Sequence, residues 1–196
     1  VVNYPFTTIE PNIGRVAIPD KRLEIVSDIV NSKKIIPTYI DFVDIAGLVK
    51  GASKGEGLGN KFLSHIREVD AIVHVVRCFE NENITHISSS INPIADIETI
   101  NTELRIADLE ILQNKVNNLQ KKIKNRDKEI KTQLEITNKL IKQINNDEII
   151  THLNWSNEQL DYINQLNLIT IKPMLYICNV EEDSISTGNM FSKKVE

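Results

Sequence analysis

One stretch of the sequence joins an apolar run, an acidic residue and a glycine-rich loop in an order that suits phosphate chemistry. Residues 40–43 read as a short buried strand, which ends at Asp44. A carboxylate at the end of a strand can hold Mg²⁺ or its water. Gly47 follows three residues later, and a glycine lets a backbone N–H approach a terminal phosphate because no side chain intervenes. The stretch predicts a phosphate-facing loop, although Asp-x-x-Gly alone also fits an ordinary surface loop.

The elements that must position this loop follow from the hydrophobic pattern. The sequence predicts strands at residues 15–18, 38–43, 70–77 and 173–178, and helices that begin near Asp20 and Leu58. If the first two strands pair, they would supply an antiparallel edge to the sheet. The third and fourth read as buried parallel strands, in which His74 is interpreted as a packed histidine rather than a metal ligand. Together these elements predict an α/β fold with a mostly parallel sheet.

The region before the last strand carries a helix start signal and several candidate core residues. Ser156 and Gln159 have the spacing of a capping box. Trp155, Leu160, Ile163 and Leu166 are expected to make core contacts around this helix. Past the last strand, residues 184–196 are polar and are expected to be poorly ordered.

Residues 94–145 change character and carry two amphipathic helical patterns. The apolar positions of the two stripes are Ile97, Ile100, Leu104, Ala107, Ile111, Leu112, Val116, Leu119 and Ile123, then Ile130, Leu134, Ile141 and Ile144. Residues 124–127 interrupt the pattern, so the sequence predicts an antiparallel helical hairpin. Basic residues gather around its predicted tip, namely Lys115, Lys121, Lys122, Lys124, Arg126, Lys128 and Lys131. This cluster fits either a solvated helical face or a prong that contacts RNA phosphates.

Composition limits the class of protein more than its function. The chain has 196 residues, 41% of them hydrophobic and 26% charged, which is enough for a globular core. The formal net charge is −4, so no global nucleic-acid footprint is present. The only cysteines are Cys78 and Cys178, which we interpret as two reduced thiols in apolar strands rather than a disulfide. No apolar run reaches the length of a membrane span.

Several blocks beyond the glycine loop point to a known family. They are NYPFTTIEPN at residues 3–12, DIAGLVKGASKGEGLGN at 44–60, HVVRCFEN at 74–81, NTELRIADLE at 101–110 and LYICNVEED at 175–183. In this order they resemble the Obg-like GTPases, and more closely the YchF subfamily of Obg-like ATPases, over nearly the whole chain. The resemblance implies a P-loop NTPase-like G domain at residues 1–95 and 148–196, with a coiled-coil hairpin inserted at 96–147.

The resemblance also implies roles for residues in the two switch segments. The second threonine of the first block, Thr8, is implied to bind Mg²⁺ together with Asp44. Leu48 stands where Ras-type switches carry a glutamine that orients the attacking water. The family's proposed substitute is a histidine in the segment after the next strand, which corresponds here to His86. A neutral imidazole can orient water or accept its proton, whereas His86 can equally be read as a solvated loop histidine.

The end of the last predicted strand carries the implied base-reading motif. GTPases use Asn-Lys-x-Asp there, but this chain has Asn179, with Val180 in place of the lysine and Glu182 in place of the aspartate. A longer carboxylate is misplaced for the bidentate contact with guanine. Adenine, which presents a donor beside an acceptor, can instead be read by backbone groups. YchF proteins share this departure, which implies that ATP is used, with GTP as an open alternative.

The function implied by the resemblance is a Mg²⁺-dependent nucleotide switch that hydrolyses ATP or GTP and acts near the ribosome or ribosomal RNA in the cytoplasm. No Gly-x-x-x-x-Gly-Lys-Ser/Thr motif occurs in the sequence. We therefore expect the P-loop to precede Val1, the family's TGS domain to follow Glu196, and this chain alone to be inactive. The alternative is a binding module whose hairpin docks on the ribosome or RNA while the G domain serves as a non-hydrolysing scaffold.

Overall fold

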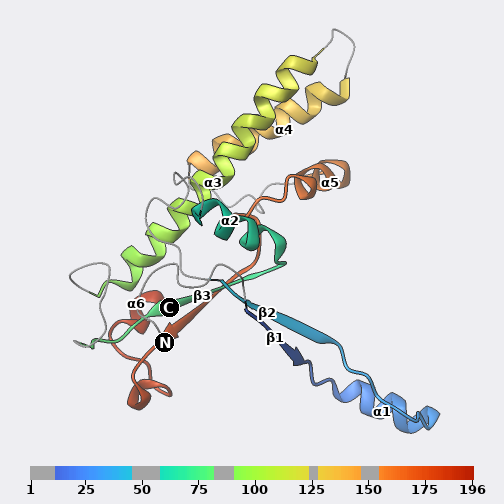
Figure 1. The fold of residues 1–196 in the computed structure, drawn as a ribbon, viewed down its shortest axis with the longest axis vertical. Helices are drawn as coiled ribbons and strands as arrows, with labels where there is room; N and C mark the ends of the chain where they lie inside the picture. The colour runs from blue at the N-terminus through green and yellow to red at the C-terminus, as the bar shows by residue number, and fades with distance from the viewer. Residues whose placement is uncertain (1–11, 46–57, 82–90, 124–127, 147–154) are drawn as a thin grey trace.

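A computed structural model describes residues 12–45, 58–81, 91–123, 128–146 and 155–196. In chain order its elements are β1 (Asn12–Ala17), α1 (Lys21–Val30), β2 (Tyr39–Asp44), α2 (Leu58–Glu68), β3 (Ile72–Arg77), α3 (Pro93–Lys122), α4 (Lys128–Asn145), α5 (Asn157–Gln165), β4 (Met174–Asn179), the 3₁₀ turn η3 (Glu182–Ser184) and α6 (Ser192–Val195). Figure 1 shows two projections from a central region: the paired helices α3 and α4, and an arm made of β1, α1 and β2.

The arm is built on an antiparallel strand pair. β1 and β2 pair from Asn12 opposite Asp44 to Ala17 opposite Tyr39. The antiparallel pairing is therefore confirmed, and it is longer than the four residues expected for its first strand. The expected place at the edge of the main sheet is wrong, because among the described residues β1 and β2 form a two-stranded sheet separate from β3 and β4. Arg15 and Asp41 lie opposite one another and form two hydrogen bonds of 2.7 Å across the pair. This pairing brings the chain back to Asp44 at the inner end of the arm (Figure 1).

The central strands form a second, parallel pair. β3 and β4 run side by side, from Ile72 opposite Met174 to Arg77 opposite Asn179. One face lies against α3, where the Asn101 amide donates to the Tyr176 hydroxyl. The other face exposes four apolar side chains in register, namely Val73, Val75, Leu175 and Ile177. The prediction of buried strands is therefore wrong for this face. In the described part of the chain, α3 packs on the opposite face, and these four side chains are 42–61% exposed.

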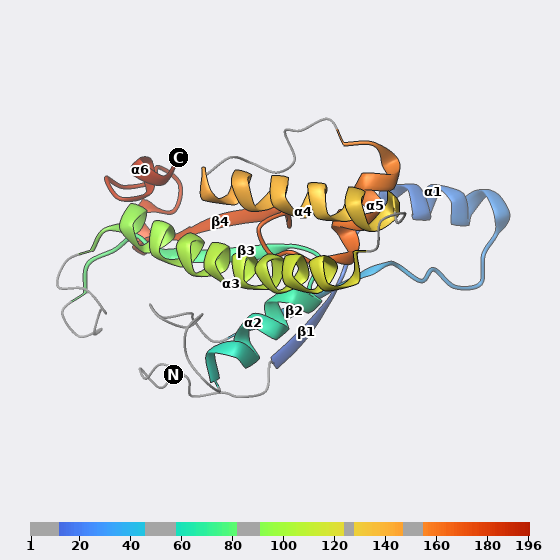
Figure 2. The same ribbon diagram turned by 90° about the horizontal axis from the view of Figure 1, so that it is seen from above.

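The helices enclose the main hydrophobic cluster beside α3 and α4. Figure 2 shows α4 lying alongside α3. α5 packs against α4, where the Tyr162 and Thr137 hydroxyls lie 2.8 Å apart. The buried residues of this cluster are Leu112, Ile136, Leu140, Ile144, Tyr162, Ile163, Leu166 and Leu168. The predicted hairpin is confirmed, but the buried stripe of α4 runs through Ile136 and Leu140, which the prediction omitted. The reason is that α4 packs against both α3 and α5, so its buried face is wider than that of a two-helix seam.

A second cluster joins the inner end of α3 to α2 and the central strands. Its buried members are Leu63, Ile66, Leu104, Ala107 and Ile169. Ile45, the residue after Asp44, packs against it, as do Ile72 and Met174. The core thus connects the start of the glycine-rich loop to the helix that follows that loop and to the strand that precedes the base-reading motif.

The C-terminal part of the chain partly differs from the sequence prediction. The capping box of Ser156 and Gln159 is present at the start of α5. Leu160, expected in the core, is 41% exposed, whereas Ile163 and Leu166 are buried. Residues 184–196 were expected to be poorly ordered, but the structure folds them through a turn at Gly188 into the short helix α6. Within the described ranges, no helix has both the length and the apolar composition needed to cross a membrane.

Candidate functional site

Asp44 ends β2 with its side chain exposed. Among the described residues the structure gives no ion pair for its carboxylate. The next residue, Ile45, anchors the backbone by packing on the α2 cluster. An exposed carboxylate on a fixed strand end is a hard oxygen donor of the kind that Mg²⁺ prefers. Asp44 therefore fits the metal-binding role expected from the sequence.

Three of the predicted site residues cannot be placed in this arrangement. Thr8, Gly47 and His86 lie outside the described residues, as does Leu48. Among the residues that the structure does describe, no three His, Cys, Asp or Glu side chains gather into a metal cluster. The metal and water-positioning roles of Thr8 and His86 and the phosphate role of Gly47 thus stay predictions from the sequence.

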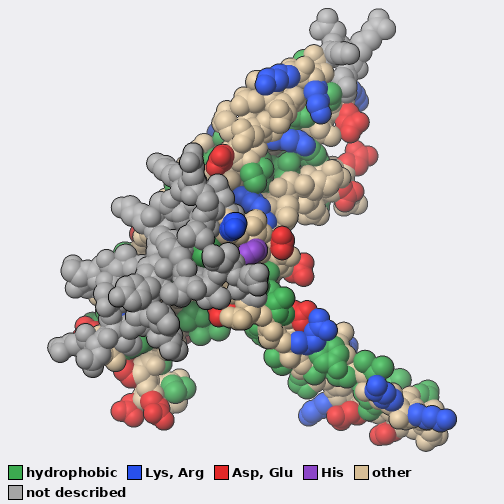
Figure 3. All heavy atoms as spheres, viewed as in Figure 1, with side chains coloured by type: hydrophobic (Ala, Val, Ile, Leu, Met, Phe, Trp, Pro, Cys, Tyr) green, Lys and Arg blue, Asp and Glu red, His purple; other side chains and the backbone are tan. Residues whose placement is uncertain are grey.

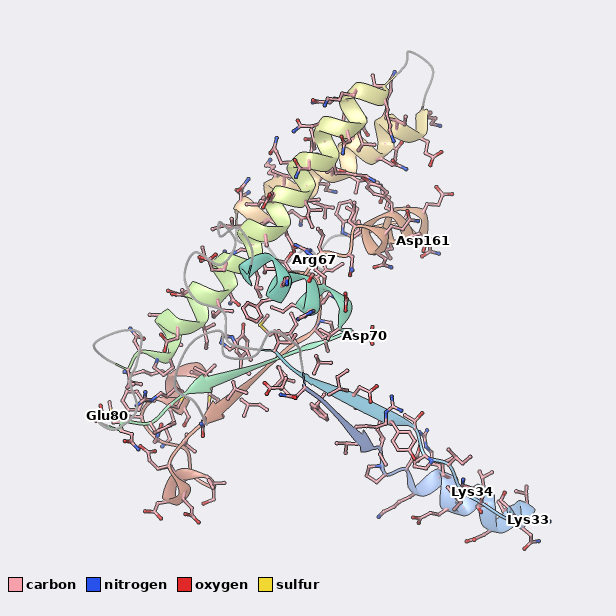
Figure 4. All side chains as sticks on the ribbon, in the orientation of Figure 1. Lys33, Lys34, Arg67, Asp70, Glu80 and Asp161 are labelled. Atoms are coloured by element: carbon pink, nitrogen blue, oxygen red, sulfur yellow. The ribbon has the colours of Figure 1, made fainter. Side chains whose placement is uncertain are left out.

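The carboxyl ends of β3 and β4 meet in a ladder that continues past the strands. The Cys78 N–H donates to the Asn179 carbonyl over 2.8 Å. Figure 4 shows the chain beyond β3 leading to Glu80, at the end of the strand pair away from Asp70. Val180 is half-buried in the turn that follows β4. The predicted base-reading residues therefore begin at a fixed strand end, beside the start of the segment that leads to His86.

Within this loop the structure distinguishes two neighbouring glutamates. Glu182, the expected counterpart of the guanine-binding aspartate, is exposed at the start of η3. The Glu181 carboxylate instead accepts a hydrogen bond of 2.7 Å from the Asn189 side chain. Sequence reasoning missed Asn189, because its contacts depend on a turn at Gly188 in a segment that was expected to lack order. A weak signal was available, since glycine and asparagine, adjacent here at residues 188 and 189, both favour turns.

The two cysteines lie together at the same strand ends. Both thiols are free, and Cys78 is buried. Burial and the adjacent Cys178 thiol raise the pKa of Cys78 to about 12. The Cys78 thiol is therefore neutral at ordinary pH and takes part in packing, as the sequence predicted for two reduced cysteines.

The helix that follows the glycine-rich loop is fixed by a buried ion pair. Arg67, near the end of α2, donates to the Asp108 carboxylate of α3 over 2.8 Å. The second carboxylate oxygen of Asp108 accepts from the backbone N–H and the hydroxyl of Thr170, each at 2.8 Å. Figure 4 shows Arg67 where α2 lies against α3. This network connects three segments: the end of α2, the paired helices and the approach to β4.

Lys172 supports the same helix end. Its ammonium group donates to the carbonyl of Arg67, in the last turn of α2, and to that of Val69, just past the helix. A cation at this place satisfies carbonyls that have no partner within the helix and complements the helix dipole. Burial lowers the pKa of Lys172, although nearby Asp70 opposes that change. The helix after the loop is therefore held by two cationic side chains.

The basic cluster expected at the hairpin tip is only partly at the tip. Lys121 and Lys122 at the end of α3, and Lys128 and Lys131 at the start of α4, are exposed. Figure 3 shows Lys and Arg side chains near the outer end of the paired helices. Lys115 is not part of the tip, because its ammonium group lies beside α5, 5.6 Å from the centre of the Tyr162 ring. Lys124 and Arg126 fall outside the described residues.

Comparisons with known proteins agree on one family. Residues 1–179 match the model of the 50S ribosome-binding GTPase family. The chain is 50% identical over 189 residues to the ribosome-binding ATPase YchF of Bacillus subtilis, covering 95% of this chain and 52% of that protein. It is 52% identical over 186 residues to the Escherichia coli O157:H7 protein of the same name, covering 95% of this chain and 51% of that protein.

A solved structure gives the same result for the fold. The Schizosaccharomyces pombe YchF GTPase superposes with a TM-score of 0.76 at 36% sequence identity, covering 98% of this chain and 53% of that chain. The P-loop NTPase-like fold predicted from the sequence is thereby confirmed. The chain spans about half the length of the curated relatives that it matches.

Proposed function

Because this chain belongs to the YchF branch of the 50S ribosome-binding GTPase family, we propose that it forms the switch and base-reading parts of a nucleotide hydrolase. In this proposal, residues 1–95 and 148–196 belong to the nucleotide-binding domain and residues 96–147 form a helical insertion. Asp44 and Thr8 bind Mg²⁺, Gly47 lies against the terminal phosphate, and residues 179–182 read the base. His86 orients the attacking water.

The observation that carries the proposal is the exposed carboxylate of Asp44 on the end of β2. Ile45 beside it is packed on the α2 cluster, and Arg67 fixes the far end of α2 to Asp108. The elements that flank residues 46–57, β2 and α2, are thereby each anchored by residues outside that segment, as the flanks of a switch loop must be if a phosphate is to order it. When bound, Mg²⁺ would offset the negative charge that develops on the transferred phosphoryl group.

The phosphate-cradling motif is the part that this sequence does not contain. Backbone N–H groups and the lysine of that motif supply most of the affinity for phosphate. We therefore assign hydrolysis to an intact protein that carries both this chain and a P-loop. The 196 residues by themselves are expected to show no turnover of ATP or GTP, and clear turnover above an Asp44→Ala control would contradict that expectation.

The metal role of Asp44 is tested by nucleotide binding to the intact protein. Asp44→Asn should weaken binding of ATP in the presence of Mg²⁺ by about tenfold to a hundredfold, and should have little effect when Mg²⁺ is chelated. Asp41→Asn is the matched control, because it makes the same change on the same strand, where the carboxylate pairs with Arg15. Equal losses in the two variants would refute the role assigned to Asp44.

The alternative function, a hairpin that docks on the ribosome, is favoured by the projecting helices and their exposed basic tip (Figures 1 and 3). Lys121→Glu with Lys122→Glu should weaken cosedimentation with ribosomes and make it less dependent on salt. The double change Lys33→Glu and Lys34→Glu is the control, because this exposed pair lies on the arm (Figure 4). Ribosome binding without any nucleotide binding would favour the scaffold alternative.

A further inference from the structure

Asn189 links three segments that are separate in the sequence. Its side-chain amide donates to the Cys78 carbonyl over 2.6 Å and to the Glu181 carboxylate over 2.7 Å. Cys78 follows β3, whereas Glu181 lies in the base-reading loop after β4. One amide group therefore connects that loop to the end of the neighbouring strand.

The orientation of this amide follows from the opposite side of the residue. The Asn189 side-chain oxygen accepts from the backbone N–H groups of Phe191 and Ser192, each at 2.9 Å. Because these groups only donate, the oxygen must face them and the nitrogen must face Cys78 and Glu181. The Asn189 N–H also donates to the Ser192 hydroxyl at 2.9 Å. The side chain thus uses both its donors and its acceptor, which fixes it in one orientation.

Gly188 places Asn189 where it can make these contacts. Its φ of +67° lies in the left-handed region, which glycine adopts readily and residues with a Cβ rarely adopt. A Cβ at this position would stand 2.8 Å from the Ser192 hydroxyl oxygen. The Gly188 N–H donates to the Ser184 carbonyl over 2.8 Å, which closes the turn after η3. The local backbone is therefore built to return the chain to the β3–β4 end.

The consequence is a loop that is held on both sides. The carbonyl of its first residue, Asn179, accepts from the Cys78 N–H. The carboxylate of its third residue, Glu181, accepts from the Asn189 amide, which also donates to the Cys78 carbonyl. Val180 lies between these two attachments and is half-buried. A fixed backbone presents one pattern of donors and acceptors, whereas a loose backbone adapts to several.

We propose that Asn189 is a positioning residue for base selectivity: it holds residues 179–182 in the conformation that distinguishes adenine from guanine. The proposal rests on the base-reading role assigned above to this loop. Adenine presents an amino donor beside a ring acceptor, and guanine presents a carbonyl acceptor beside an N–H donor. A site with fixed hydrogen-bonding groups rejects the wrong pattern, because one of its polar groups is left unpaired.

The test uses Asn189→Asp in the intact protein. The change keeps the oxygen that accepts from the Phe191 and Ser192 N–H groups, but it replaces the donor that faces Cys78 and Glu181 by a second oxygen. We expect the ratio of the dissociation constants for GTP and ATP to fall by about tenfold, as befits one lost charge-assisted hydrogen bond. The unfolding temperature measured alongside shows that the variant is folded.

Two further variants separate this role from a purely structural one. Ser192→Ala removes the hydroxyl that bonds the Asn189 backbone but leaves both donors of the Asn189 amide. Its ratio of GTP and ATP dissociation constants should therefore match that of the parent protein. In the double variant Asn189→Asp with Glu181→Gln, the amide introduced at position 181 can donate to the carboxylate introduced at position 189. This bond should recover part of the lost preference for ATP over GTP. Absence of any recovery, or an equal fall in Ser192→Ala, would overturn the proposal.

The outcomes also separate this inference from the proposed function. If the parent protein binds neither ATP nor GTP, the proposed function fails. If it binds both with the same affinity, or if Asn189→Asp leaves its preference unchanged, the proposed function stands and the role of Asn189 is refuted.

Discussion

Replacing Asp108 by alanine removes the carboxylate that joins α2, α3 and the approach to β4. The Asp108 side chain is fully buried, and the Arg67 side chain is only 15% exposed. In the variant, the guanidinium keeps the carbonyls of Ala107 and Asn167 but loses its counter-charge. The Thr170 N–H and hydroxyl lose their acceptor as well. The change therefore leaves the Arg67 guanidinium without its counter-ion and the Thr170 N–H without its acceptor.

The expected cost is large relative to the stability of a domain. Removing one partner of a buried ion pair costs about 3–5 kcal/mol. An orphaned backbone N–H alone costs about 1–3 kcal/mol, and the two effects overlap because they share one carboxylate. We expect Asp108→Ala to lower the free energy of unfolding by about 3–5 kcal/mol, against a usual total of about 5–15 kcal/mol.

The assay is urea unfolding of the intact protein, followed by circular dichroism and by the fluorescence of Trp155, which packs against the main cluster. Glu110→Ala is the control, because it removes an exposed carboxylate from the same helix and should change stability by less than about 0.5 kcal/mol. Arg67→Met combined with Asp108→Leu should be less destabilised than the sum of the single changes. A loss below about 1 kcal/mol for Asp108→Ala would refute this account of the network.

Two further predictions concern the strand pair and the packing of α5. Burial lowers the pKa of His74 from its ordinary 6.5, against the opposing attraction of Asp96, so the unfolded chain binds a proton at a pH where the folded chain does not. His74 therefore makes the parent protein more stable at pH 7 than at pH 5. The difference between the urea midpoints at the two pH values should be smaller in His74→Asn than in the parent protein. An identical difference would contradict this role of His74. The Thr137 hydroxyl donates to the Gln133 carbonyl, so it must accept from the Tyr162 hydroxyl at 2.8 Å. Tyr162→Phe should therefore cost about 1 kcal/mol, whereas a cost near zero would show that the buried bond adds nothing.

Local sequence patterns predicted the elements that depend on neighbours in the chain. The strands β1 and β2, the two helices of the hairpin and the capping box at Ser156 all follow from spacing within a short window. Asp44 at a strand end was predicted for the same reason, since an apolar run stops there. The P-loop NTPase-like fold followed from the order of several motifs rather than from any one of them.

The contacts that the sequence did not reveal join residues far apart in the chain. Arg67 and Asp108 are 41 residues apart, and the side chain of Asn189 reaches a carbonyl 111 residues away. No periodicity encodes such pairs, because each depends on how separate elements pack. The exposed face of β3 and β4 was missed because an apolar run has the same pattern whether or not a neighbour covers it.

The most direct test of the proposed function is the structure of the intact protein bound to Mg²⁺ and a non-hydrolysable ATP analogue. We expect an Asp44 oxygen to lie about 2.0–2.1 Å from the metal, or to bond one of its waters, with the Thr8 hydroxyl on the same ion. Asp44 and Thr8 on opposite sides of the molecule in that bound form would contradict it.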